Sequence, residues 1–262
     1  MAWKPETQDA LAVIPARYGS TRFPGKPLAK DTGKYLIQHV VEKAGQALRI
    51  KRVVVATDDQ RIFDAVKSFG AEAVMTRADH PNGTSRIAQV IASPAFAGFS
   101  IIVNVQGDEP DIEPRVIDEL VEGLTVDTEA PMATLASPFA DDEDPADPNI
   151  VKVVLATVKG RHRALYFSRS LIPYDRDRST ADLDRKLYLK HPGLYAYRRD
   201  FLPRYVALPP TPLEQTEQLE QLRALEHGHA IALVKTMVRH HGIDTPEQYE
   251  AFVQRHRLPS RT

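Results

Sequence analysis

The sequence predicts an α/β protein built on a mostly parallel sheet that is flanked by helices. Three observations support this prediction. Short apolar runs of strand length alternate with amphipathic segments of helical period, the alternation fills the first half of the chain, and 262 residues suffice for one large domain with a buried core. Strands that alternate with helices are joined by right-handed crossovers, so ligands are expected at the carboxyl ends of the strands.

The first half of the chain contains four strands and four helices by this pattern. Strands are expected at 11–16, 52–57, 71–75 and 100–105, and helices at 35–47, 60–69, 84–91 and 113–124. Apolar residues recur at helical spacing in the first helix at Leu36, Val40 and Ala44, and Gly70 is a suitable residue to end the second.

The middle of the chain differs in composition. An acidic, proline-containing stretch at 140–149 precedes strands at 151–155, 164–167 and 193–197, with the charged stretch 173–185 between the last two. These features predict a small antiparallel insertion over roughly 150–212. A helix at 213–225, a strand at 230–234, a turn at 242–244 and a final helix from Thr245 follow, the last with Pro246 in its first turn. We expect a flexible extension at 1–10, a single domain at 11–252 and a polar tail at 253–262.

Composition excludes several classes of protein. The 34 Lys and Arg residues nearly balance the 35 Asp and Glu residues, so no overall positive field exists to hold a nucleic acid. The absence of cysteine removes disulfides and thiolate-bound zinc. The N-terminus lacks the apolar stretch of a signal peptide, and no apolar run approaches the ~20 residues of a membrane span. We therefore expect a soluble protein that is not exported and has no membrane partner.

The most informative segment follows the first strand, at residues 15–27. It reads Pro-Ala-Arg-Tyr-Gly-Ser-Thr-Arg-Phe-Pro-Gly-Lys-Pro and combines three cations, two hydroxyls and two glycines. Such a loop directs backbone N–H groups and positive charge at phosphates, and a triphosphate fits it. It matches neither the P-loop nor the dinucleotide-binding pattern. The alternative interpretation is a solvated basic loop.

Two carboxylates are candidates for a magnesium site. Asp108 follows a buried strand at the expected ligand edge, and Asp244 lies in another turn after a strand. Hard cations take carboxylate oxygens together with water and substrate phosphates. An acidic residue after a strand is more often a turn former or helix cap, so only the pairing favours a metal.

A third group of candidates lies in and after the insertion. Arg169 follows apolar strand residues and is expected to pair with a carboxylate of the substrate or of the protein. Glu214, Glu217 and Glu220 are three residues apart, so one helix would place them on one face, either to bind sugar hydroxyls or as a solvated acidic face. The remaining histidines considered are interpreted as surface residues: His227, His229, His240, His241 and His256.

Five motifs of the chain resemble those of a known family. The motifs at 13–28, 56–59 (Ala-Thr-Asp-Asp), 103–110 (Val-Asn-Val-Gln-Gly-Asp-Glu-Pro), 164–169 (Ala-Leu-Tyr-Phe-Ser-Arg) and 212–223 are similar to those of 3-deoxy-manno-octulosonate (Kdo) cytidylyltransferases, over residues 11–252. The resemblance implies a Rossmann-like nucleotidyltransferase fold. It also implies a cytoplasmic homodimer that joins CTP and Kdo, with Mg²⁺, to give CMP-Kdo and pyrophosphate for lipopolysaccharide biosynthesis.

The resemblance also implies roles for individual residues. It assigns Arg17, Ser20, Arg22 and Lys26 to the triphosphate, and Pro15, Ala16, Arg86 and Gln106 to the neighbourhood of the nucleoside. Asp108 and Asp244 become the Mg²⁺ ligands, and Lys26, Arg22, Asp108 and Asp244 the catalytic group. The sugar-acid pocket takes Arg169, His191, Tyr195, Glu220 and Gln221.

Two positions depart from the family pattern, and alternatives to Kdo stay open. Ser85 stands where the family commonly has Asp or Glu, and the stretch before Gly242 is shortened to Arg239-His240-His241. An 8-amino analogue of Kdo (8-amino-3,8-dideoxy-Kdo) or sialic acid would need the same loop and carboxylates. A catalytically silent protein that binds nucleotide or sugar acid is the alternative from another class.

Overall fold

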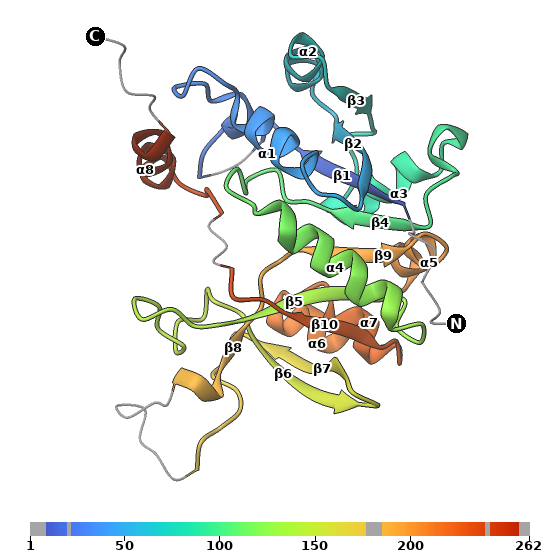
Figure 1. Ribbon diagram of the computed structural model, residues 1–262, viewed down its shortest axis with the longest axis vertical. Coiled ribbons are helices and arrows are strands. Elements are labelled where there is room, and N and C mark those ends of the chain that lie inside the picture. The colour runs from blue at the N-terminus through green and yellow to red at the C-terminus, as the bar shows by residue number, and fades with distance from the viewer. Residues whose placement is uncertain (1–8, 20–21, 177–184, 239–241, 257–262) are drawn as a thin grey trace. The chain divides into compact units, whose positions relative to one another are not determined.

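The computed structural model describes residues 9–19, 22–176, 185–238 and 242–256. The chain divides into two compact units, one formed by 1–118 with 240–262 and the other by 119–239 (Figure 1). The boundary lies within helix α4 (Pro114–Val126). Several predictions lie outside the described residues: those for 1–8, Ser20, 177–184, the shortened loop 239–241 and the last residues of the tail, 257–262.

The first unit contains the predicted parallel sheet. Its strands run in the order β4-β1-β2-β3, and all three neighbouring pairs are parallel. Their bounds are β1 (Ala10–Ala16), β2 (Ile50–Thr57), β3 (Glu72–Met75) and β4 (Ile101–Asn104). Every residue of β4 is buried, as expected of a strand covered on both faces. The alternation of strands and helices predicted for this half of the chain is confirmed.

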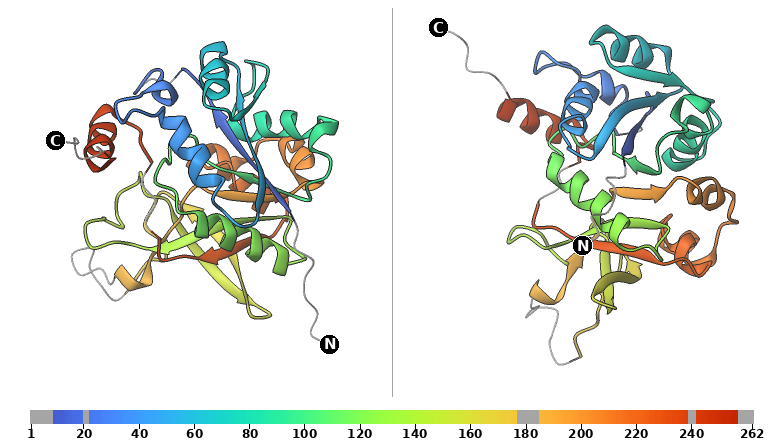
Figure 2. Two further views of the ribbon diagram at one scale, coloured as in Figure 1. Left: turned by 45° about the horizontal axis from the view of Figure 1, so that its top comes forward. Right: turned by 45° about the vertical axis from the view of Figure 1, so that its right-hand side comes forward.

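Helices cover both faces of this sheet. Helices α1 and α3 lie on opposite sides of β1 and β2 (Figure 2). Asn82 caps α3, because its side chain accepts a hydrogen bond from the N–H of Ser85, and Gly70 (φ 81°) follows α2. The bounds are α1 (Leu36–Ala44), α2 (Gln60–Ser68), α3 (Gly83–Ile91) and the 3₁₀ turns η1 (Lys26–Leu28) and η2 (Pro94–Phe96).

Helix α8 (Pro246–His256) completes the first unit. Phe252 and Val253 are buried with Leu36 and Ile243, so the helix packs through an apolar face. It extends to His256, beyond the point at which the polar tail was predicted to begin. Among the described residues of the whole chain, no helix has the length and apolar character needed to cross a membrane.

The second unit is a mixed sheet organised around a strand that the sequence did not predict. Strand β5 pairs in parallel with β10 and antiparallel with β8 and β9, whereas β6 and β7 form an antiparallel hairpin closed by Lys159 and Gly160. Both turn residues have positive φ, as a type I′ turn requires. The bounds are β5 (Met132–Pro138), β6 (Lys152–Val158), β7 (Arg161–Ser168), β8 (Leu189–Lys190), β9 (Tyr195–Arg198) and β10 (Ile231–Lys235).

The predicted helix at 213–225 is wrong as a single element. It is broken into α6 and α7 at Gln218, whose φ of 54° lies in the left-handed region. Glu217 and Glu220 therefore do not share one helix face. The helical bounds are α5 (Phe201–Ala207), which was not predicted, α6 (Pro212–Glu217), α7 (Leu222–Glu226) and the 3₁₀ turn η4 (Arg185–Leu187).

Candidate active site

The carboxyl ends of β1 and β4 meet closely in the first unit. A Cβ atom added to Gly107, just after β4, would lie 2.9 Å from the carbonyl oxygen of Pro15. A Cβ on Gly83, at the start of α3, would lie 3.0 Å from Cγ of Pro15. These two glycines let the backbone of three elements converge, and they place the predicted residues Pro15, Ala16, Gln106 and Asp108 along one edge.

Lys26 is the centre of a charged cluster at this edge. Its ammonium donates to Oδ2 of Asp108 at 3.0 Å, to the carbonyl of Ile243 at 2.5 Å and to Oδ1 of Asp244 at 3.5 Å. The Lys26 side chain is 12% exposed, compared with 32% for Asp108 and 43% for Asp244. The ammonium is thus largely enclosed by the protein, whereas both carboxylates are partly exposed to solvent. Arg22, which is more exposed, pairs with Oδ2 of Asp244 at 3.1 Å.

The shape of the loop explains how Lys26 reaches this position. Gly25 adopts a left-handed conformation (φ 71°), and its N–H donates to the carbonyl of Tyr18 at 2.9 Å. A Cβ on Gly25 would lie 3.0 Å from the Tyr18 ring, so the ring packs directly on the glycine. The guanidinium of Arg61 covers the same ring, 3.4 Å from its centroid. The sequence motif contained both loop residues, but nothing in it indicated Arg61 as their support.

Arg86 and Arg17 hold different positions from those expected of ligand-facing cations. The Arg86 side chain has no exposed surface and donates to Asp58 at 2.9 Å and to the hydroxyl of Thr76. The Arg86 guanidinium is thus held inside the protein by these two partners. Arg17 is exposed and donates to the carbonyl of His80 at 3.2 Å, which leaves most of its guanidinium facing solvent.

The guanidinium of Arg169, in the second unit, donates to backbone carbonyls and, among the described residues, not to a carboxylate. It donates to the carbonyls of Glu217 at 2.8 Å, Pro148 at 3.1 Å and Gln218 at 3.4 Å. The Glu217 carboxylate instead accepts from the hydroxyl of Ser168 at 2.6 Å and the N–H of Arg169 at 2.9 Å. Glu217 therefore orders the end of β7. The predicted carboxylate partner within the protein is not found among the described contacts of this guanidinium.

A buried lysine that the sequence analysis did not select supports Arg169. Lys152 has no exposed surface, and its ammonium donates to the carbonyl of Asp147 at 2.9 Å and to that of Arg169. Burial lowers the pKa of Lys152. The sequence contained an indication of this buried lysine, because Lys152 lies between Val151 and Val153 in an otherwise apolar strand.

His191 and Tyr195 form a direct pair on the second unit. Nε2 of His191 lies 2.8 Å from the hydroxyl of Tyr195, and its Nδ1 lies 3.2 Å from the carbonyl of Leu135. Burial, together with the nearby charge of Glu220, raises the pKa of the Tyr195 phenol far above its ordinary range. The phenol is therefore a neutral hydroxyl.

Glu220 and Gln221 lie in the link between α6 and α7. Gln221 is 3% exposed, and its Nε2 has no hydrogen-bond partner in the described part of the chain. The carbonyl of Glu220 accepts from the hydroxyl of Tyr205 at 2.7 Å. Glu214 is separate from this group: its carboxylate pairs with Arg223 and is 12% exposed, so the solvated acidic face considered from sequence is also wrong.

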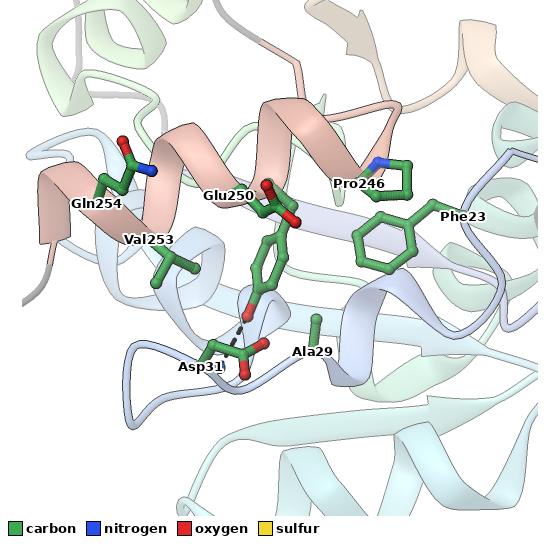
Figure 3. A pocket seen from close by; sticks show the side chains of 8 residues that line it. Phe23, Ala29, Asp31, Pro246, Glu250, Val253 and Gln254 are labelled. Atoms are coloured by element: carbon green, nitrogen blue, oxygen red, sulfur yellow. Dashed lines mark hydrogen bonds between the residues drawn. The ribbon is translucent and has the colours of Figure 1, made fainter.

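A cavity of about 530 Å³ lies between the loop after β1 and helix α8 (Figure 3). Phe23 and Pro246 line one end and Gln254 the other, and the hydroxyl of Tyr249 accepts from the N–H of Asp31 at 2.8 Å. None of the predicted site residues that the structure describes lines this cavity.

A parallel sheet whose carboxyl edge joins a cationic loop to two facing carboxylates is the arrangement of a nucleotidyltransferase. A family profile described as Cytidylyltransferase matches residues 11–237. A 3-deoxy-manno-octulosonate cytidylyltransferase from Syntrophobacter fumaroxidans is 50% identical over 243 residues, 93% of this chain and 95% of that protein. One from Syntrophotalea carbinolica is 52% identical, over 90% and 94% of the two chains. The chain belongs to the 3-deoxy-manno-octulosonate cytidylyltransferase family.

Solved structures agree with this placement. A CMP:2-keto-3-deoxy-manno-octonic acid synthetase complexed with CTP has a TM-score of 0.84 and 45% identity, covering 94% of this chain and 97% of that one. A 4-diphosphocytidyl-2C-methyl-D-erythritol synthase from Anaerococcus prevotii has a TM-score of 0.60 at 10% identity, covering 95% of this chain and all of that one. The second likeness concerns the fold alone.

Proposed function

We propose that this protein activates 3-deoxy-manno-octulosonate with CTP to give CMP-Kdo and pyrophosphate. The observation that carries the proposal is the convergence of Lys26, Asp108 and Asp244 at the carboxyl edge of the parallel sheet. A cation held among carboxylates beside a glycine-containing loop suits the charge of a nucleoside triphosphate. The family relatives carry the same activity in their names.

The reaction is a single displacement at phosphorus. The C2 hydroxyl oxygen of the sugar acid attacks the α-phosphorus of CTP in line with the leaving group, a new C–O–P link forms, and the bond from the α-phosphorus to the β-phosphate oxygen breaks. The hydroxyl proton passes to solvent and pyrophosphate departs. Negative charge grows on the leaving oxygens, so positioned cations stabilise the transition state more than the ground state.

We assign to Lys26 and Arg22 the stabilisation of the negative charge that grows on the leaving oxygens. The Lys26 ammonium is largely buried and already fixed by three acceptors, so little reorganisation is needed when phosphate oxygens replace a carboxylate as its partner. Arg22 is 64% exposed and reaches the cluster from the solvent side through Asp244. We assign Arg17 and Ser20 to the triphosphate on the resemblance, together with Pro15, Ala16, Arg86 and Gln106 near the nucleoside.

A divalent cation fits the same cluster. Asp108 and Asp244 both contact one ammonium, so their oxygens can be shared by one cation, and two carboxylates plus substrate phosphates are a usual Mg²⁺ set. The described residues contain no group of three or more His, Asp or Glu that would hold a metal without substrate. We propose Mg²⁺, held by Asp108 and Asp244. When bound, such a cation supplies Lewis-acid stabilisation of phosphate charge.

The sugar acid is proposed to bind residues of the second unit. The Gln221 amide is a buried donor with no partner in the described chain, and such a group is costly unless a ligand pairs with it. The neutral Tyr195 hydroxyl and His191 offer further hydrogen bonds. We assign the sugar carboxylate to Arg169, whose donors would then exchange backbone carbonyls for the ligand, and the hydroxyls to Glu220 and Gln221.

The proposal extends to the setting of the protein. We propose a cytoplasmic homodimer that supplies activated sugar for lipopolysaccharide biosynthesis, because its nucleotide substrate is a cytoplasmic metabolite and the family resemblance implies a dimer. Light scattering of the purified protein at several concentrations tests the assembly. A mass of one chain throughout the range would contradict it.

Pyrophosphate release is the test of the activity. Purified protein is mixed with CTP, Mg²⁺ and Kdo, beside parallel reactions with UTP, the 8-amino sugar or sialic acid, each with and without EDTA. We expect rapid release with CTP and Kdo that stops with EDTA. Pyrophosphate release with another sugar alone would support the same reaction on that sugar in place of Kdo. No release with any sugar, in protein shown to be folded, would favour a protein that binds nucleotide or sugar acid without catalysis.

A further inference from the structure

The segment 108–111 is bonded to both ends of the chain segment that contains α8. Just before the helix, the N–H of Ile243 donates to the carbonyl of Asp108 at 2.8 Å. At its last residues, Arg255 donates to Oδ2 of Asp111 at 2.9 Å, and Nε2 of His256 donates to Oδ1 at 2.6 Å. The Asp111 carboxylate thus accepts hydrogen bonds from two side chains at the end of α8.

A hollow lies between these two connections. It measures about 380 Å³ and is lined by Asp111, Gly242, Ile243, Gln248, Ala251 and Arg255. A hollow offers few packed atoms to set the distance between its walls. The bonds at its margins therefore tie the 108–111 segment to α8 on this side of the helix, in addition to the apolar packing on its other face.

Asp244 is attached to the first turn of α8. The backbone N–H groups of Asp244 and Thr245 donate to Oε1 of Gln248 at 2.7 and 3.1 Å. The helix between Pro246 and His256 is 11 residues long, or roughly 16 Å at 1.5 Å per residue, and its backbone hydrogen bonds make it stiff along its axis. A stiff helix would carry a shift at Asp111 to its opposite end, where Asp244 contacts Lys26 at 3.5 Å.

We propose that Asp111 is a positioning residue: by holding Arg255 and His256 it fixes α8, and through α8 it fixes the Asp244 carboxylate opposite Lys26 and Asp108. This inference rests on the proposed function, because it assigns Asp244 a role in binding metal and triphosphate. Asp111 itself is directed at the end of the helix and not at Lys26.

The surroundings of Asp111 favour a lasting ionic connection. Burial opposes its ionisation, but hydrogen bonds from Arg255 and His256 outweigh this effect and lower the pKa of Asp111. His39 lies beside His256, with ring centroids 5.7 Å apart, and also contacts Phe252. Burial and the neighbouring His256 lower the pKa of His39, so His39 adds no competing charge near neutral pH.

The test compares Asp111→Asn with a matched control, Glu72→Gln. Glu72 also forms a two-bond ion pair, with Arg52, at 2.7 Å for each bond, but it lies at the start of β3 and away from α8. Three quantities are measured for each variant: Mn²⁺ affinity in the presence of CTP by electron paramagnetic resonance, the Mg²⁺ concentration for half-maximal pyrophosphate release, and KM for Kdo.

We expect Asp111→Asn to weaken Mn²⁺ affinity and to raise the half-maximal Mg²⁺ concentration, each by roughly threefold to tenfold, the loss expected for charged hydrogen bonds that act at a distance. KM for Kdo should not change in Asp111→Asn. Asp111→Glu, which keeps the negative charge, should show at most half of the loss in Mn²⁺ affinity. The control Glu72→Gln should match the wild type. A role confined to stability would lower the amount of folded protein and leave metal affinity per folded molecule unchanged.

Unchanged Mn²⁺ affinity and Mg²⁺ dependence in folded Asp111→Asn would overturn the proposal. If that variant does not fold, Arg255→Gln replaces it, because Arg255 is 53% exposed and supplies one of the two bonds. A wild-type protein that binds Mn²⁺ and CTP but activates no sugar would contradict the proposed function alone, since the comparison of affinities would still decide the role of Asp111. A wild type that binds no Mn²⁺ would overturn both.

Discussion

The ammonium of Lys26 lies 3.0 Å from Oδ2 of Asp108, although 82 residues separate the two in the chain. The pair joins the loop after β1 to the loop after β4, which are neighbouring strands of the parallel sheet. Without a cation between them, the carboxylates of Asp108 and Asp244 would repel each other. Lys26 therefore holds the two carboxylates together, and the proposed function assigns the same ammonium to the triphosphate.

Substitution Asp108→Ala is expected to reduce turnover more than it reduces sugar binding. Asp108 contacts the Lys26 ammonium, which we assign to the phosphates, so its contribution should appear mainly in the transition state. We expect kcat to fall by about 100-fold or more, with KM for Kdo changed by less than about threefold. Steady-state pyrophosphate release at saturating CTP measures both.

The matched control for this substitution is Asp64→Ala. Asp64 is an exposed carboxylate on α2 that accepts a hydrogen bond from Gln60 at 2.7 Å. Its removal should leave turnover within about twofold of the wild type, because exposed contacts of this kind contribute little. Turnover of folded Asp108→Ala close to that of Asp64→Ala would remove Asp108 from the mechanism.

Much of the first unit could be predicted because its pattern is local. Strand β4 contains the apolar run 101–103, and α2 ends just before Gly70, as its sequence suggests. The loop residues Lys26 and Asp108 follow strands whose carboxyl ends must meet in a parallel sheet. Their convergence was therefore implied by topology, before any distance was known.

The second unit was predicted less well for physical reasons. Strand β5 mixes Ala, Thr and Ser with larger apolar residues, and its burial depends on partners distant in the chain, β9 and β10. The break at Gln218 requires a left-handed residue that is not glycine, which no local rule favours. The partners of Arg169 are backbone carbonyls, and residue types carry no information about these acceptors.

Substitution Gly107→Ala should displace Asp108. The added methyl would lie 2.9 Å from the carbonyl oxygen of Pro15, a backbone atom that cannot move aside cheaply. We expect kcat to fall by about tenfold or more, since small displacements of a catalytic group are costly. Gly98→Ala is the control, because its added methyl has no atom within 4 Å among the described residues beyond its two chain neighbours. Wild-type kinetics for Gly107→Ala would show that the loop tolerates the shift.

Substitution Tyr195→Phe should weaken sugar binding selectively. It removes the hydroxyl that lies 2.8 Å from Nε2 of His191 and leaves the ring in place. We expect KM for Kdo to rise by roughly threefold to tenfold, the loss of about one hydrogen bond, while KM for CTP stays the same. Titration of the sugar at saturating CTP measures the first value. An equal rise in both KM values would indicate a general structural defect instead.

Asp127 should stabilise the second unit in a pH-dependent manner. Its carboxylate is 2% exposed and accepts from Arg163 at 2.8 and 2.9 Å, with Arg161 at 3.5 Å. Hydrogen bonds from Arg163 outweigh burial and lower the pKa of Asp127 below its ordinary value. The stabilisation is present above the unfolded-state pKa of about 3.9 and is lost as the pH falls through the lower folded-state pKa.

The expected result is that Asp127→Asn lowers the free energy of unfolding by about 2 to 3 kcal/mol at pH 7, the cost of weakening charged hydrogen bonds at a buried site. The difference from the wild type should shrink below about pH 4, because the unfolded-state carboxylate then binds a proton, and it should shrink further as the pH falls through the lower folded-state pKa. Urea unfolding at pH 7 and pH 3 measures both values. Asp200→Asn is the control: its pair with Arg204 is 70% exposed and should contribute less than about 1 kcal/mol. A loss for Asp127→Asn that is the same at both pH values would show that the side chain contributes through its shape and not through its charge.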